Sequence, residues 1–294
     1  MTEQVQIFEV GPRDGLQNEK AKISSEQKIE LVDLLSDAGF SKIEVTSFVS
    51  PKWVPQMKDA PIVMKGIKRK PGVTYAALTP NKMGYQFARK AGADEVAIFA
   101  AASETFSQRN INCSIADSIE RFQPVIEAAT ADKIPVRGYI SCAVACPYEG
   151  AIDPEAVARI TKILLDIGCY EISLGDTIGA GTPETIVAML EAVLKVTEAD
   201  KLAGHYHDTG NRALNNIEAS LEKGIRTFDS AIGGLGGCPY APGAKGNIST
   251  SAVVDMLHRQ GFDTGIDRAA LDPIEAFVGK LVAEAIEHTK QKLH

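Results

Sequence analysis

A histidine pair near the end of an apolar run is the most informative feature of the sequence. The run reads Leu202-Ala203-Gly204-His205-Tyr206-His207 and is followed by Asp208. Because side chains alternate between the two faces of a strand, we expect His205 and His207 on one face, within reach of a single metal ion. Two strand residues with ordinary hydrogen bonds give the same pattern, so the context of the pair decides between the two interpretations.

Three other stretches carry side chains able to complete a metal site. They are Arg13-Asp14, Glu44 and the segment from Gly233 to Asn247. Imidazole, carboxylate and amide oxygen together favour a borderline or hard divalent ion over one that prefers thiolates. Asn247 fits equally well as the cap of a helix expected over residues 248–260.

Composition places the chain among ordinary globular proteins. It has 294 residues, 45% hydrophobic and 23% charged, with a formal net charge of −7. That charge, without any basic run, argues against a nucleic-acid partner, and no apolar run approaches the ~20 residues of a membrane span. The start resembles neither a signal peptide nor an Arg-rich transit peptide, so we expect a cytoplasmic enzyme.

The cysteines predict buried thiols rather than a disulfide framework. Their number, five, is odd, and they are scattered along the chain. Cys142 and Cys146 stand four apart, but no second pair lies nearby to complete a structural zinc site.

Eight short apolar runs, each followed by a helix-like stretch, predict an α/β fold. Because the runs are almost continuously apolar, they are typical of parallel strands buried on both faces. They cover residues 6–14, 42–48, 73–79, 95–103, 136–143, 170–177, 202–209 and 227–235. The first choice is a (β/α)8 TIM barrel, a single domain over 1–294 whose residues 262–294 form extra C-terminal helices. A doubly wound open sheet is the second.

The barrel interpretation brings distant residues together. Active sites of TIM barrels lie at the C-terminal ends of the strands, and the candidate residues all follow such ends. They are Asp14, Glu44, Asp176, His205, His207 and the 233–247 segment.

Several longer motifs resemble the 3-hydroxy-3-methylglutaryl-CoA lyase family, among the metal-dependent barrel lyases and Claisen-type condensing enzymes. The similarity extends from Gln6 to about Gly265. The matching stretches cover residues 10–19, 46–57, 110–114, 170–177 and 234–241. Among them, Ser47-Phe48-Val49-Ser50-Pro51-Lys52-Trp53-Val54-Pro55-Gln56 and Gly234-Leu235-Gly236-Gly237-Cys238-Pro239-Tyr240 are specific to the lyase.

The resemblance implies cleavage of 3-hydroxy-3-methylglutaryl-CoA to acetyl-CoA and acetoacetate with bound Mg²⁺ or Mn²⁺. It implies Arg13 opposite the enolate and Cys238 as the catalytic cysteine of a mobile loop. The implied metal ligands are Asp14, His205, His207 and Asn247. Glu44 and Asp176 match acidic residues of the same site. Our hypothesis is that Glu44 positions Arg13 or a ligand, while Asp176 holds a metal-bound water or a proton.

Substrate contacts are expected from the loops above the same face. We expect Gln17, Asn110 and Ser114 to bind the acyl-CoA substrate, with the last two in the loop after the fourth strand. Lysines over this face fit either the CoA phosphates or plain solvation. These are Lys20, Lys22 and Lys52.

Two features depart from the best-known members of the family. Gly210-Asn211-Arg212 stands where they carry Tyr-Gly-Gln, and the end Lys292-Leu293-His294 is not a peroxisomal signal. Both indicate a bacterial type. The alternatives are a condensing synthase, an aldolase of 4-hydroxy-2-oxo acids, and a catalytically silent binding barrel. A homodimer built partly from the apolar stretch 273–286 is expected.

Overall fold

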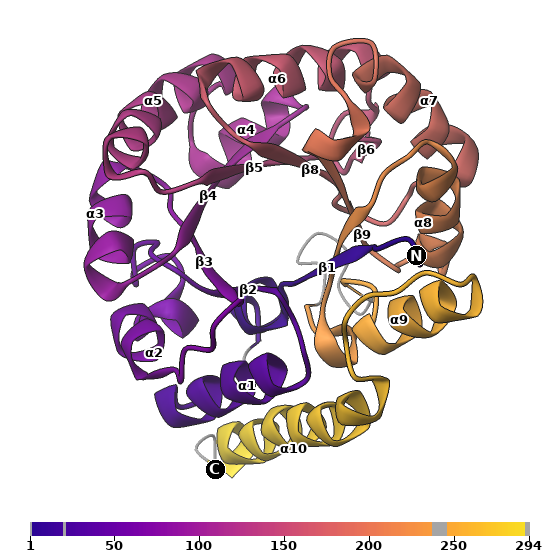
Figure 1. The fold of residues 1–294 in the computed structure, drawn as a ribbon. Coiled ribbons are helices and arrows are strands. Elements are labelled where there is room, and N and C mark those ends of the chain that lie inside the picture. Colours follow the sequence, from indigo (N-terminus) through magenta and orange to yellow (C-terminus); the bar gives the residue numbers. More distant parts are fainter. Residues whose placement is uncertain (1, 20–21, 237–245, 292–294) are drawn as a thin grey trace.

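Eight parallel strands close into one barrel with the helices outside it (Figure 1). The computed structural model describes residues 2–19, 22–236 and 246–291, with side chains up to residue 283. Around the barrel the strand order is β1-β10-β9-β8-β5-β4-β3-β2. The first strand pairs with the last, from Gln6 with Thr227 to Glu9 with Ser230. This closure confirms the TIM barrel and excludes the open sheet.

Each barrel strand lies inside one of the predicted runs. The strands are β1 Gln6–Glu9, β2 Lys42–Ser47, β3 Thr74–Leu78, β4 Glu95–Ala101, β5 Val136–Ser141, β8 Glu171–Asp176, β9 Leu202–Tyr206 and β10 Thr227–Ser230. A small antiparallel hairpin, which the sequence did not predict, separates β5 from β8. It consists of β6 Ala145–Cys146 and β7 Gly150–Ala151.

Three of the helices begin at a polar side chain that caps their first turn. Side chains of Ser24, Asp153 and Thr182 each accept a hydrogen bond from a backbone N–H of the following first turn. The α-helices are α1 Ser25–Asp37, α2 Ala60–Gly66, α3 Lys82–Ala91, α4 Glu104–Ile111, α5 Ile115–Asp132, α6 Pro154–Ile167, α7 Pro183–Val193, α8 Ala213–Glu222, α9 Thr250–Arg259 and α10 Arg268–Gln291. Short turns of other helix types are η1 Gly11–Gly15, η2 Pro55–Met57, η3 Ala199–Lys201 and η4 Ile232–Gly234.

The first and last predicted strands are shorter than expected. In the run 6–14 the strand ends at Glu9, and η1 follows as one turn of π-helix. Pro12 has no N–H for a strand ladder, while the Val10 carbonyl accepts hydrogen bonds from Arg13, Asp14 and Gly15. In the run 227–235 the strand stops at Ser230 and becomes η4. Two tight turns, rather than strand ends, therefore border the site.

The C-terminal extension is one helix, α10, rather than several. It packs against α1, α9 and η4 along one side of the barrel (Figure 1). Its buried side chains are Leu271, Ile274, Val278 and Leu281. Within the described ranges, no helix has the length and apolar character that crossing a bilayer requires.

The barrel contains two different kinds of interior. The main apolar cluster fills the space between the strands and the surrounding helices. Inside the barrel, Glu44, Arg137, Glu171 and Asp229 are buried among small apolar clusters. Four cysteines are buried and free, as the sequence predicted: Cys113, Cys142, Cys146 and Cys169. A charged centre is therefore built into the part of the fold nearest the predicted site.

Candidate active site

A cavity of about 750 Å³ opens at the C-terminal ends of the barrel strands. Residues from η1, from the strand ends and from α4 line it, so segments more than a hundred residues apart share one wall. Its lining includes Arg13, Asp14, Gln17, Trp53, Leu78, Phe99, Arg109, Asn110, Arg121, Tyr139, Thr177, His205, His207 and Gly236. The cavity lies at the end of the barrel where the sequence predicts the site.

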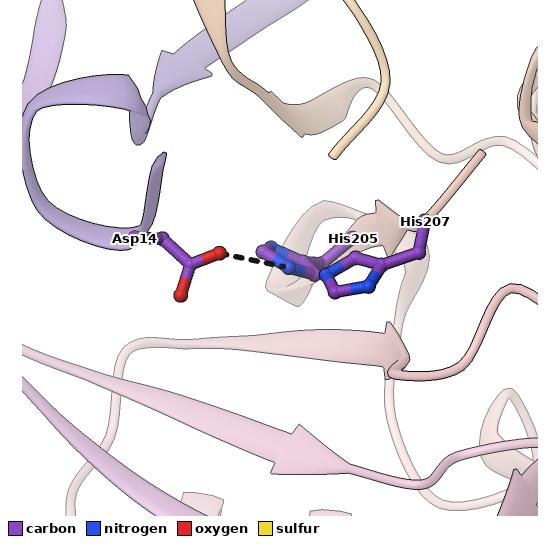
Figure 2. A group of neighbouring side chains, drawn as sticks. All are labelled: Asp14, His205 and His207. Carbon is purple, nitrogen blue, oxygen red and sulfur yellow. Dashed lines mark ion pairs between the residues drawn. The ribbon is translucent and has the colours of Figure 1, made fainter. Parts of the chain in front are cut away.

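Asp14, His205 and His207 converge at this cavity (Figure 2). One possible ligand atom from each residue lies within 4.8 Å of the others. The Nε2 atom of His205 is 4.0 Å from Asp14 Oδ2, and the two imidazole rings are 5.4 Å apart between centroids. The expected same-face arrangement of the histidine pair is therefore present.

The protonation states of this group suit a divalent cation. Burial and neighbouring His205 lower the pKa of His207 to about 4, and its Nδ1 has no hydrogen-bond partner. Burial opposes ionisation of Asp14, but Arg13 and the two imidazoles outweigh it and bring its pKa to about 2. A neutral imidazole with a buried unpaired nitrogen, next to an ionised carboxylate, is a donor set that a divalent ion fits.

Asn247 contacts this group from the segment just before α9. Its Nδ2 donates to Asp14 Oδ2 at 2.8 Å and to the Leu235 carbonyl at 3.2 Å, and its backbone forms a β-bridge with His207. The alternative interpretation of Asn247 as a helix cap is wrong, because Ser249 is the N-cap residue of α9. The amide therefore lies next to the Asp14-His205-His207 group.

Arg13 is held by two carboxylates. Its Nε donates to Glu44 Oε2 and its NH1 to Asp14 Oδ1, both at 2.6 Å, and the guanidinium lies 5.5 Å from the Tyr139 ring centroid. These ion pairs raise the pKa of Arg13 further, although burial opposes them. The pKa of Glu44 is raised because burial outweighs the charge of Arg13, and Glu44 Oε1 has no partner. Glu44 therefore lies where we would expect a residue that positions Arg13.

Asp176 faces away from the cavity, unlike its neighbours Gly175 and Thr177. Its carboxylate accepts hydrogen bonds from the backbone N–H groups of Ala180 and Gly181, at 3.1 and 2.8 Å. Arg212, one of the departures from the family pattern, donates to the Gly181 carbonyl of the same turn. Asp176 therefore holds a turn and lies outside the cavity lining, while the charge of His205 still acts on its carboxylate.

The predicted substrate residues divide into two groups. Gln17 lines the cavity with a buried, unpaired Oε1, and Asn110 lines it from α4, a helix where a loop was expected. Ser114 does not line the cavity, since its hydroxyl caps α5 by accepting from the Asp117 N–H. The segment that carries Cys238 lies outside the described residues.

Of the lysines expected over this face, the two that the structure describes do not line the cavity. Lys22 is exposed, and Lys52 lies over the ring of Trp53. Lys20 falls outside the described part of the chain.

Sequence reasoning missed several charged residues. Arg109 and Arg121 line the outer part of the cavity. Placing Asn110 on a helix would have drawn attention to its neighbour Arg109. Asp229 contacts His205 from β10, and the argument applied to Glu44, a carboxylate in an apolar strand, would have found it as well.

The closed (β/α)8 barrel and the Asp-His-His group at its C-terminal face place the protein in a class: barrel enzymes with a candidate divalent-metal site. The chain belongs to the HMGL-like family, whose sequence profile matches residues 4–278.

Three similar proteins illustrate the relationship. A 3-hydroxy-3-isohexenylglutaryl-CoA/hydroxy-methylglutaryl-CoA lyase of Pseudomonas aeruginosa is 56% identical over 92% of this chain and 90% of its own. The crystal structure of the HMG-CoA lyase from Brucella melitensis is 58% identical with a TM-score of 0.94, covering 96% and 99% of the two chains. A lyase from Acinetobacter baumannii, solved with coenzyme A and 3-methylmalate, is 37% identical with a TM-score of 0.91, covering 95% and 92%.

Proposed function

We propose that the protein is a carbon–carbon lyase that cleaves 3-hydroxy-3-methylglutaryl-CoA to acetyl-CoA and acetoacetate. The observation that carries this proposal is the convergence of Arg13 with the Asp14-His205-His207 group at the cavity of an HMGL-like barrel. Its relatives of more than 50% identity carry that activity in their names. The reaction removes the proton of the 3-hydroxyl, breaks the bond between C2 and C3, and protonates C2 of the released acetyl-CoA enolate.

Asp14, His205, His207 and Asn247 would hold one Mg²⁺ or Mn²⁺. Asn247 would bind through its amide oxygen, which requires a flip of the amide that here donates its Nδ2 to Asp14. When bound, such an ion acidifies the substrate's 3-hydroxyl and fixes its orientation. Support comes from the ligand atoms within 4.8 Å and from the unpaired Nδ1 of His207.

Arg13 supplies a permanent positive charge for the enolate oxygen that appears as the C2–C3 bond breaks. Because the charge develops only in the transition state, this contact increases turnover rather than ground-state binding. Glu44 keeps the guanidinium in place through the 2.6 Å ion pair. We assign the proton delivered to C2 to the Cys238 thiol, a weak acid suited to that transfer. Asp176, with its raised pKa, is proposed to keep the turn beside His207 in place rather than to exchange that proton.

The acyl-CoA chain would enter past the outer cavity wall. Gln17 and Asn110 line this wall and fit polar contacts to the acyl or pantetheine part, whereas Ser114 would act only through the start of α5. Arg109 and Arg121 also line the cavity, and we propose that they pair with the CoA phosphates. The Acinetobacter relative, solved with coenzyme A, supports a CoA ester as the substrate.

The test is acetoacetate release from 3-hydroxy-3-methylglutaryl-CoA, after EDTA treatment and with Mg²⁺ or Mn²⁺ restored. We expect release only with metal, and a loss of at least ~10²-fold in His205→Ala. His258→Ala is the matched control, because His258 is exposed and bonds Thr264 far from the cavity. Acetoacetate release that is unchanged by EDTA treatment would overturn the metal assignment. No release, with metal still bound, would favour a condensing synthase or a 4-hydroxy-2-oxo acid aldolase.

We also infer that the enzyme works as a dimer in the cytoplasm. The free, buried cysteines agree with a reducing compartment, and α10 offers a long face beside the barrel. Sedimentation of the purified protein and fractionation of source cells test the two statements separately. A monomer at micromolar concentration, or recovery outside the cytoplasmic fraction, would contradict them.

A further inference from the structure

Asp229 contacts one of the two histidines of the site from the neighbouring strand. In the pairing of β9 with β10, His205 stands directly opposite Asp229. The Nδ1 atom of His205 lies 3.0 Å from Asp229 Oδ2, while its Nε2 faces Asp14 across 4.0 Å. The imidazole therefore lies between two carboxylates, one on each nitrogen.

Asp229 can act only as an acceptor in this contact. The Arg137 guanidinium donates to both of its oxygens, so the carboxylate pairs as an anion. An ionised carboxylate accepts hydrogen bonds and donates none. In the neutral imidazole the ring proton must then be on Nδ1, which leaves the lone pair on Nε2.

The Asp229 carboxylate is itself fixed on its other sides. Arg137 donates to both of its oxygens, from NH1 at 3.1 Å and from NH2 at 2.8 Å, and Ser173 Oγ donates to Oδ2 at 2.7 Å. The Nε of Arg137 is in turn bound to Glu171 at 2.6 Å. All four side chains are buried, so a chain of charges from β8 through β5 and β10 ends at His205.

The second histidine has no such support. His207 Nδ1 is buried and has no partner among the described residues. The two imidazoles thus differ, since Nδ1 of His205 has a buried carboxylate partner while Nδ1 of His207 has none.

We propose that Asp229, fixed by Arg137, is a positioning residue of the cation site that orients His205 and holds its Nε2 lone pair toward Asp14 and His207. The inference rests on the metal site proposed above. Carboxylates behind metal-binding histidines set ring orientation and tautomer in this way, and their loss typically weakens metal binding ~10–100-fold.

The test compares two truncations of the same network. Asp229→Ala and Glu171→Ala each remove one of the two carboxylates that pair with Arg137, but only Asp229 contacts His205. Mn²⁺ affinity is measured from the electron paramagnetic resonance signal of the free ion. We expect binding ~10–100-fold weaker in Asp229→Ala and within about threefold of wild type in Glu171→Ala.

Two outcomes of the binding test would overturn the proposal. One is an Asp229→Ala protein that binds Mn²⁺ like the wild type, in which case the metal site itself still stands. The other is an equal loss in both variants, which would show general loosening of the interior. A wild type that binds no Mn²⁺ would overturn this inference and the proposed metal site together.

A spectroscopic measurement needs no variant to fold. Nitrogen-15 NMR of the metal-free wild type, with labelled histidine, reports which ring nitrogen of His205 carries the proton. We expect the proton on Nδ1 in the neutral ring, and a mixture of tautomers in Asp229→Ala because water can donate or accept there. A proton on Nε2 in the wild type would overturn the proposal.

Discussion

Arg13 and Asp14 are adjacent in sequence and pair with each other, and each also has partners of its own. Arg13 reaches back to Glu44, while the second Asp14 oxygen faces His205 and Asn247. Since the guanidinium is only 6% exposed and lies at the cavity wall, it is already desolvated before substrate arrives. A charge fixed in this way is most effective against an enolate that exists only transiently.

Replacing this charge should affect turnover more than binding. For Arg13→Gln we expect kcat to fall ~10²–10³-fold, with KM changed by less than about fivefold. Steady-state acetoacetate assays measure both constants. Arg159→Gln, an exposed arginine of α6, is the control and should leave kcat unchanged. A rise in KM at constant kcat would assign Arg13 to substrate binding instead.

Glu9 is a buried acid below the two turns that border the site. Its Oε1 accepts from the N–H groups of Gly11 and Ile232, and Thr250 donates to its Oε2. Burial outweighs these hydrogen bonds and raises the pKa of Glu9 from 4.5 to about 7. A raised pKa stabilises the fold below pH ~4.5, and this stabilisation is lost as pH rises through ~7.

A neutral isostere should remove this pH dependence. Glu9→Gln keeps the two backbone contacts, and its amide can donate to Thr250 where Glu9 accepts. We expect similar unfolding free energies near pH ~5, and a variant more stable by up to ~3 kcal/mol near pH ~8. Urea denaturation at both values measures the difference. Parallel pH profiles for the two proteins would contradict it.

The sequence predicted best those residues that a general rule of strand or barrel geometry brings together. His205 and His207 follow from strand alternation, and Asp14 follows from the barrel rule on strand ends. The position of Asp176 could not be predicted in this way, because whether a strand-end carboxylate faces the cavity or a backbone turn depends on the loop that follows. Arg121 was missed because one exposed arginine in a helix carries no local signal.

At the scale of elements, the π-helical turn η1 is the least predictable part of the fold. Its residues Gly11 to Asp14 were included in the first predicted strand. What decides its shape is contact with η4, a turn more than two hundred residues later. A Cβ on Gly15 would lie 2.6 Å from Leu235 Cβ, so the two turns touch with no room between them.

A methyl group at this contact should disturb both turns. We expect Gly15→Ala to lower the unfolding free energy by ~1–3 kcal/mol and to weaken Mn²⁺ binding, because Asp14 is the adjacent residue. Gly279→Ala is the matched control: it lies in α10 with nothing near its Cβ position, and should be neutral or stabilising by up to ~1 kcal/mol. Urea unfolding and Mn²⁺ titration measure the effects. Equal behaviour of the two variants would show that the turns can separate freely.

At the scale of the whole molecule, a chain of net charge −7 is proposed to bind an anionic CoA ester. Its overall field repels such a ligand, so local cations must dominate near the cavity. Arg109 lies 4.4 Å from the Tyr148 ring centroid and Arg121 donates to the Ile111 carbonyl, which places both at the outer wall. Length, composition and the repeated strand–helix rhythm predicted the barrel, but not this distribution of charge.

Removing one of these cations should weaken substrate capture and leave the chemistry intact. For Arg121→Gln we expect KM for 3-hydroxy-3-methylglutaryl-CoA to rise ~5–20-fold with kcat within about twofold, and a weaker salt dependence of kcat/KM. Assays at low and high ionic strength measure this, with Arg159→Gln as the control. An unchanged KM would place the phosphates elsewhere on the rim.

The side chain of Tyr139 lies between the cavity and the charged interior of the barrel. Arg13 lies on its ring at 5.5 Å, Arg137 lies on it at 5.1 Å, and its hydroxyl accepts from Arg137 NH1 at 3.1 Å. Anyone who redesigns the enzyme for a bulkier substrate by trimming this ring would also loosen both guanidinium groups. The size of the accepted substrate and the positions of the two guanidinium groups therefore depend on the same side chain. A variant with broader specificity will need compensating changes around Arg137.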